Sequence, residues 1–168
     1  MRIARTARMV WMCGVLTLLP AAQAVAAIDS YMTITGSKQG PIKGAAAKEG
    51  GSEGSIAVSA VMHESAPAGA MAGKRQHSPI TITKEIDQAS PKLFQAMNTH
   101  EVLSEVTITF TRSGSGAGKA AQKIVLTNAT ITSIRKVGNS EQITFDYPTI
   151  EVTWVSGGKT MSDDWLSR

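Results

Sequence analysis

The stretch HSPITITKEIDQASPKLFQAM, residues 77–97, changes its hydrophobic period from two to about three and a half. Its first half alternates, with Ile80 and Ile82 on one face and Thr81 and Thr83 on the other. Alternation with β-branched residues is typical of a half-buried β-strand. The same segment therefore predicts a strand that leads into a helix.

The second half of the stretch carries the signals of a helix start. Ser90 is a favoured N-cap residue, and Pro91 suits the first helical position, where its missing N–H costs nothing. Leu93, Phe94 and Met97 then share one face. A helix of two or three turns is marginal alone in water, so we expect it to pack against a sheet.

The polar residues between the two halves fit an architectural role. We expect Thr81, Thr83 and Lys84 to decorate the strand. Asp87 lies just upstream of the helix and can interact with its positive end.

The remaining chain alternates far more than it coils. Six strand-like stretches joined by glycine-rich turns predict a mainly β domain, with two packed antiparallel sheets forming a sandwich or barrel-like body and one short α-helix at about 90–98. Val106, Ile108 and Phe110 are expected to point inward. The strand-like stretches are 30–35, 55–62, 79–84, 105–112, 122–134 and 142–155.

Two of these stretches are interrupted. Asn128 and Pro148 each break a long alternating run. A bend or bulge at such a position would let one strand serve two sheets.

The N-terminus has the pattern of a secretory signal peptide. Arg2, Arg5 and Arg8 precede an apolar core, and small residues allow cleavage after Ala24 or Ala26. The core is about half of the roughly 20 apolar residues that span a bilayer. We therefore expect a signal peptide at 1–26, a domain at 27–168, export across the inner membrane, a periplasmic or secreted location, and no membrane span after cleavage.

Removal of this leader changes the cysteine count and the charge. The one cysteine, Cys13, leaves with it, so disulfides, thiolate metal sites and a cysteine nucleophile are excluded from the mature chain. The 17 Lys and Arg fall by three to 14, against 13 Asp and Glu. A net charge near +1 gives no argument for nucleic-acid binding.

The titratable residues form no catalytic or metal motif in the sequence. His63, His77 and His100 have no spacing that favours zinc, and no HExxH motif occurs. Asp163 and Asp164 are interpreted as a solvated acidic pair rather than a cation site.

The remaining signals are equally unspecific. The glycine-rich loops lack the phosphate-binding pattern, and the serines lack a GxSxG motif. Arg135 and Lys136 are an isolated basic pair, and Trp154 and Trp165 fit a core or an interface better than a stacking platform. We expect no catalytic residue, no cofactor, no metal and no enzyme activity.

The opening stretch resembles the hallmark of the Hcp family, the tube protein of the type VI secretion system. Three further segments, after Glu105, at 141–154 and at the C-terminal DDWLSR, also resemble the family, so the likeness covers most of residues 28–168. The matching motif residues are His77, Pro79, Thr83, Lys84, Ile86, Asp87, Ser90, Pro91 and Leu93.

The resemblance implies a β-barrel-like fold of two packed sheets with one flanking helix. It also implies a homo-oligomer, a hexameric ring that stacks into a tube, with effectors carried in the lumen and other tube components as partners. The leader departs from the family, whose members are loaded from the cytoplasm without such a signal.

The loop at residues 36–54 is the candidate for an arm that reaches a neighbouring subunit. Its low-complexity composition is equally compatible with a plain surface loop. The self-association residues that we single out in it are Lys38, Lys43, Lys48, Glu49 and Glu53.

Two other functions stay open from the sequence. One is a periplasmic or secreted binding module on the same fold without tube assembly. The other is a small secreted hydrolase whose site is assembled only in three dimensions.

Overall fold

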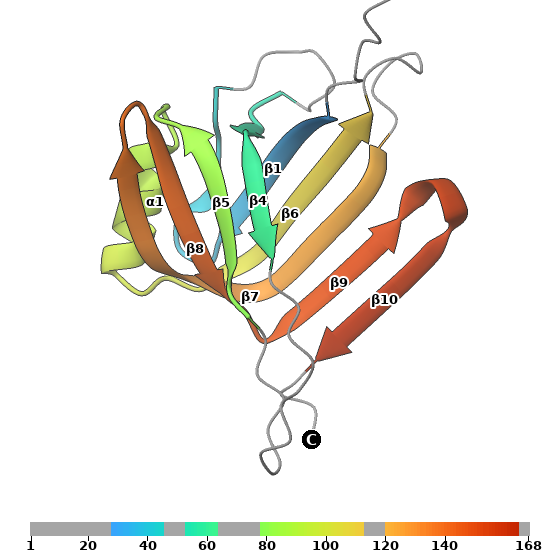
Figure 1. The fold of residues 1–168 in the computed structure, drawn as a ribbon. Helices are drawn as coiled ribbons and strands as arrows, with labels where there is room; N and C mark the ends of the chain where they lie inside the picture. The colour runs from blue at the N-terminus through green and yellow to red at the C-terminus, as the bar shows by residue number, and fades with distance from the viewer. Residues whose placement is uncertain (1–27, 46–52, 64–77, 113–119, 165–168) are drawn as a thin grey trace, which may run out of the picture.

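Two antiparallel sheets share one long strand, β7 (Ala120–Val137), and enclose the hydrophobic core between them (Figure 1). The computed structural model describes residues 28–45, 53–63, 78–112 and 120–164. The first half of β7 pairs with β6 (Leu103–Arg112) and β9 (Thr149–Trp154). Its second half pairs with β8 (Ser140–Asp146). The expected pair of packed sheets is confirmed.

The other strands extend the two sheets outward from β7. In the second sheet the order continues from β8 to β5 (Ile80–Glu85) and β4 (Ala60–His63). In the first sheet, β1 (Ile28–Gly36) lies beside β6. Two short strands, β2 (Gly40–Ile42) and β3 (Ile56–Val58), both pair with β1. The last strand, β10 (Lys159–Asp164), follows the short 3-10 turn Val155–Gly157 and pairs with β9.

The alternation in the sequence places the core residues as expected. Val106 and Ile108 of β6 are fully buried, and Phe110 packs against the core while partly exposed. Ile80 and Ile82 of β5 are fully buried on the opposite sheet. Period-two patterning therefore identifies the inner face of each sheet.

The helix α1 (Ser90–Asn98) occupies the predicted range, but its buried face differs from the prediction. Ala89, Leu93 and Ala96 are buried, whereas the Phe94 side chain is 53% exposed. These three residues lie four and three positions apart, so they form one stripe, and Phe94 is rotated about 100° from Leu93. The expectation that Phe94 faces the core is wrong.

The stretch at 55–62 is two strands rather than one. Its first part, β3, pairs with β1 in the first sheet, and its second part, β4, pairs with β5 in the second sheet. Ser59 stands between them and donates both its backbone N–H and its hydroxyl to the Thr83 carbonyl, at 2.8 and 2.9 Å. Local alternation cannot reveal this change of sheet, because both halves keep the strand period.

β7 changes sheets at Asn128. This residue has a φ of 55°, in the left-handed region that asparagine tolerates better than most residues. Pairing with β6 and β9 ends beside it, and pairing with β8 begins at Thr130. Pro148 stands in the break between β8 and β9, where the chain returns to the first sheet. The predicted interruptions at both positions are confirmed.

Several expectations lie outside the described residues. They include the signal peptide, His77, Lys48, Glu49 and Trp165. Within the part of the chain that the structure describes, no helix has the length and apolar character needed to cross a membrane.

The turn at Asn128 gives a test of this sheet change. We expect Asn128→Ala to lower the free energy of unfolding by about 1 kcal/mol, because alanine is strained at positive φ. Asn128→Gly should leave it nearly unchanged. Asn98→Ala, at an exposed helix position, is the control and should change little. Urea unfolding of the variants measures these effects, and equal stability of Asn128→Ala and the parent chain would contradict this role.

Candidate functional site

The segment between β5 and α1 contains a buried cluster of charges around Lys84. The Lys84 side chain is 0% exposed. Its Nζ lies 2.8 Å from Asp87 Oδ1 and 2.9 Å from Glu141 Oε1. It also donates to the Glu85 carbonyl at 2.6 Å and to Ser90 Oγ at 3.1 Å. The expectation that Lys84 decorates the outside of the strand is wrong.

The cluster joins three elements that are distant in sequence. Lys84 comes from β5, Glu141 from β8 and Ser90 from the first turn of α1. Ser90 Oγ donates to Glu141 Oε1 at 2.6 Å. An unpaired buried charge costs several kcal/mol, so these contacts fix the helix start against the second sheet. Because no solvent reaches the ammonium, a substrate cannot approach it either.

The N-cap of α1 is Ala89, not Ser90 as predicted, and Asp87 binds the backbone just before the helix. Asp87 Oδ1 accepts the Ala89 N–H at 2.9 Å, and its Oδ2 accepts the Ala45 N–H at 3.1 Å. Burial by itself raises the pKa of the Asp87 carboxyl, but hydrogen bonds from Lys84, Ala45 and Ala89, together with the Lys84 charge, hold that pKa below its ordinary value.

Ser90 is the first helical residue, not the N-cap. Its hydroxyl accepts the Asp87 N–H at 3.1 Å and therefore serves the connection and the cluster. Pro91 is therefore the second helical residue, one position later than predicted, and still lies in the first turn.

The other motif residues are distributed around this cluster. Thr83 is half-buried on β5, and Pro79 precedes that strand at the surface. Leu93 is fully buried, whereas Ile86 is 42% exposed. The motif thus combines core, cluster and surface positions.

Glu101 anchors the turn between β1 and β2. Its Oε1 accepts the backbone N–H groups of Lys38 and Gln39, at 2.7 and 2.9 Å, and its Oε2 accepts the Gln39 side-chain amide at 2.9 Å. Gly36 lies so close that an added Cβ would overlap Oε1. The base of the candidate arm is thereby attached to the end of α1.

These donors change the acidity of Glu101. Burial by itself raises the pKa of the carboxyl. The Gln39 and Lys38 hydrogen bonds and the Lys38 charge outweigh burial and hold the pKa below 4.5, the ordinary value. Glu101 therefore stabilises the fold most while it is ionised.

The two described histidines, His63 and His100, take part in contacts that hold the fold together. His63 Nε2 lies 3.1 Å from the hydroxyl of Tyr147, and that hydroxyl donates to the Ser78 carbonyl at 3.0 Å. Burial, and then the Asp146 charge, raise the pKa of Tyr147 to about 12, so the phenol remains a donor. His100 has a φ of 50° and ends α1 with a Schellman pattern, in which the Glu101 N–H bonds the Ala96 carbonyl.

Asp163 and Asp164 lie on β10, the edge strand of the first sheet. Among residues 28–45, 53–63, 78–112 and 120–164, no three His, Cys, Asp or Glu side chains converge as metal ligands would. The absence of a metal site remains a prediction from the sequence.

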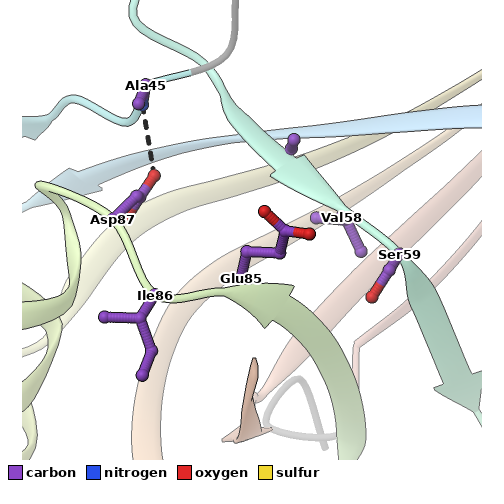
Figure 2. Close-up of a pocket in the computed structure, with 7 residues that line it drawn as sticks. Ala45, Val58, Ser59, Glu85, Ile86 and Asp87 are labelled. Atoms are coloured by element: carbon purple, nitrogen blue, oxygen red, sulfur yellow. Dashed lines mark hydrogen bonds between the residues drawn. The ribbon is translucent and has the colours of Figure 1, made fainter. Parts of the chain in front are cut away.

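Two hollows flank the charge cluster. The first, of about 350 Å³, lies between β5 and the β3–β4 connection. Figure 2 shows the Glu85 carboxylate directed toward that connection and Asp87 bonded to Ala45. Ser59 also lines this hollow, and its hydroxyl donates to the Thr83 carbonyl at 2.9 Å.

The second hollow, of about 330 Å³, lies beside α1, and we call it the α1 groove. Its apolar walls are Ile86, Pro91, Phe94 and Ile134. Glu141 and Lys136 border it.

Glu141 and Glu101 were not singled out from the sequence. Glu141 shares the face of Ile143 and Phe145 by strict alternation, so the strand pattern places it inside. Glu101 follows the helix directly, and no local pattern indicates its contact with Lys38 and Gln39, more than 60 positions away.

Comparison with known proteins shows one family. The sequence profile described as "Type VI secretion system effector, Hcp" matches residues 31–154. The "Major exported protein" of Pseudomonas aeruginosa is 34% identical over an alignment of 167 residues. The alignment covers 84% of this chain and 97% of that protein.

Two solved structures agree with this match. The secreted protein Hcp3 from Pseudomonas aeruginosa has a TM-score of 0.72 and 32% identity, covering 83% of this chain and 99% of that one. A double mutant of the Hcp1 protein from E. coli EAEC 042 has a TM-score of 0.73 and 28% identity, covering 83% and 98%.

The charge cluster predicts a large effect of Lys84→Met. This change leaves Asp87 and Glu141 uncompensated, so we expect it to lower the free energy of unfolding by about 3–5 kcal/mol in urea titrations. Lys123→Met, at an exposed position on β7, is the matched control and should stay within about 0.5 kcal/mol.

A double variant separates the charge from the packing. Lys84→Met with Glu141→Leu should recover part of the loss, because an apolar pair replaces a half-broken ion pair. A loss below about 1 kcal/mol for Lys84→Met alone would contradict the structural role of the cluster.

The low pKa of Glu101 predicts a pH-dependent stability. A depressed folded-state pKa stabilises the fold above the unfolded value, and this stabilisation disappears as the pH falls through the folded pKa. We therefore expect Glu101→Gln to destabilise the protein at neutral pH. The difference in the free energy of unfolding between this variant and the parent chain, which we call the stability gap, should narrow progressively below pH 4.5.

Urea unfolding midpoints of the variant and the parent chain across the acidic pH range measure this stability gap. Glu151→Gln, at an exposed position on β9, is the control and should show a small gap that changes little with pH. A Glu101→Gln gap that is constant with pH would contradict the assignment.

Proposed function

Because this chain belongs to the Hcp family of the type VI secretion system, we propose that the mature protein is a structural subunit that forms hexameric rings, which stack into a tube and carry effectors. The observation that carries the proposal is the family match over residues 31–154, together with relatives that are covered over 97% and 99% of their own length. A secreted tube protein of this family acts through assembly and not through catalysis.

The arrangement of the charged residues supports an architectural role. Lys84, Asp87 and Glu141 satisfy one another inside the protein, and Glu101 holds a turn. The strongest polar groups of the described chain thus hold its own elements together. This is what a subunit needs when it must present fixed surfaces to its neighbours.

We propose that the loop at 36–54 contributes to self-association as an arm. Lys38, Lys43 and Glu53 are exposed, and the Gly44 N–H bonds the Gly54 carbonyl at 2.9 Å, so the base of the loop is closed. Charges of both signs on such a loop favour contacts with a neighbour over non-specific association. Lys48 and Glu49 belong to the same proposal.

We also propose that residues 1–26 are a cleaved signal peptide, which sends the protein across the inner membrane. Relatives are named as exported and secreted proteins. Effectors and other tube components are the proposed partners, and the ring would meet them outside the cytoplasm.

Sizing of the mature chain tests ring formation. We expect light scattering to give a mass near six protomers, and negative-stain microscopy to show closed rings. Lys43→Glu should weaken assembly without changing the unfolding midpoint, whereas Lys123→Glu should leave both assembly and the midpoint unchanged.

A stable monomer at high protein concentration would contradict the ring. That result would favour the binding module on the same fold, with the hollows beside the charge cluster as its first candidate sites.

A further inference from the structure

The candidate arm begins with residues 37–45, which follow α1 in the reverse direction, and we call this segment the arm base. At its start the Ser37 N–H donates to the Val102 carbonyl, beyond the end of α1, at 2.9 Å. At its other end the Ala45 N–H donates to Asp87 Oδ2, before the start of α1, at 3.1 Å (Figure 2). The contacts between these two ends keep the same order, so the arm base and α1 lie side by side and antiparallel.

Glu101 holds the first end of the arm base from the C-terminal side of α1. Its carboxylate accepts the backbone N–H groups of Lys38 and Gln39 and the Gln39 side-chain amide. The same amide donates to the Lys92 carbonyl of α1 at 3.2 Å. Hydrogen bonds to an ionised carboxylate are among the stronger ones in proteins, so this end of the arm base is held firmly.

Asp87 and Gln88 hold the second end from the N-terminal side of α1. Gln88 Nε2 donates to the Gly44 carbonyl at 2.6 Å, next to the bond between Ala45 and Asp87. Asp87 also lies 2.8 Å from the Lys84 ammonium, so this end of the arm base is attached to the buried charge cluster.

Packing around Gly44 fixes the arm base as well. A Cβ on Gly44 would lie 2.7 Å from both Ile56 Cα and the Ser55 carbonyl oxygen. These are backbone atoms, which cannot move aside as the end of a flexible side chain can. The Gly44 N–H donates to the Gly54 carbonyl at 2.9 Å, and Ile42, two positions earlier, is 2% exposed in the core. The backbone of the arm base therefore has one orientation.

We propose that Gln88 and Glu101 are positioning residues for self-association, which set the orientation of the arm base before a neighbouring copy binds. This inference rests on the proposed role of the arm. A segment that must become ordered on binding lowers the affinity, whereas a segment already held in its bound orientation avoids this loss. Lys38 and Lys43 are exposed on the held backbone, so the same contacts direct these two charges.

Gln88 gives the cleanest test, because its side chain is exposed and lies outside the charge cluster. Gln88→Leu keeps the size of the side chain and removes the donor. We expect it to raise the concentration for half-assembly, measured by light scattering, about 5-fold, which corresponds to one hydrogen bond. Gln88→Lys returns a donor of similar reach and should recover part of the assembly. Glu101→Gln should weaken assembly more, because a charged acceptor of several bonds is lost.

Hydrogen exchange of the monomer shows whether a variant loosens the arm base or the whole fold. It is measured below the concentration at which the chain assembles. We expect the amides of Gly44 and Ala45 to exchange about 5-fold faster in Gln88→Leu than in the parent chain. Asn128→Ala, with a similar expected loss of global stability, should leave the exchange of these two amides and the half-assembly concentration unchanged, because its site lies outside the arm base.

Two further variants are matched controls. Gln95→Leu is the same chemical change at an exposed position of α1, and it should leave the exchange of Gly44 and Ala45 unchanged. Ser55→Ala removes a buried hydroxyl that has no hydrogen-bond partner in the described part of the chain. It alters the surroundings of Gly44 without removing a contact that holds the arm base, so both exchange and assembly should stay as in the parent chain.

The outcomes separate this inference from the ring itself. Faster exchange of Gly44 and Ala45 with unchanged assembly of Gln88→Leu would overturn the positioning role and leave the ring standing. Unchanged exchange in Gln88→Leu would show that this side chain does not hold the arm base, and equal effects of Gln88→Leu and Asn128→Ala on assembly would show a dependence on global stability alone. Either result would also overturn the positioning role. A parent chain that remains monomeric would overturn both proposals.

Discussion

The buried charge cluster around Lys84 is the constraint on which the rest of the structure depends. An ammonium group that is removed from water destabilises the fold by several kcal/mol unless opposite charges surround it. Here Asp87 and Glu141 provide those charges, at 2.8 and 2.9 Å. Because the three residues come from β5, the connection to α1 and β8, the ion pairs fix the helix start against the second sheet. Asp87 and Glu141 also line the α1 groove, so the buried ion pairs help to fix the shape of this surface groove.

The second constraint is the division of β7 between two sheets. Asn128 adopts a left-handed conformation at the point where the pairing partner changes from β6 and β9 to β8. The two sheets therefore diverge from one strand, and the β9–β10 hairpin extends on the flank away from α1 (Figure 1). A subunit of this form offers two distant flanks, which is the geometry that a head-to-tail ring requires.

Much of this fold is present in the sequence as local pattern. Alternation located most of the strands but not β2 or β10. The range of α1 was correct, and Asn128 was recognised as an interruption. The errors have physical reasons. Lys84 lies on the same strand face as Ile80 and Ile82, so the period-two alternation indicated that it is buried. It was nevertheless expected at the surface because its side chain is charged. Its partner Glu141 is 57 positions away, and no local pattern reports such a contact. Phe94 was placed on one helix face with Leu93 and Met97, although the small residues Ala89 and Ala96 define the packed stripe. Ser59 divides a run that looks continuous, because only tertiary pairing distinguishes two sheets.

We propose that the protein acts through assembly of rigid subunits whose buried charged residues pair within their own chain. Cryo-electron microscopy of the mature, assembled protein tests this claim most directly. We expect closed rings in which every subunit keeps the Lys84–Glu141 contact within its own chain. Particles that consist of single copies, or rings in which Lys84 pairs across the subunit boundary, would contradict it.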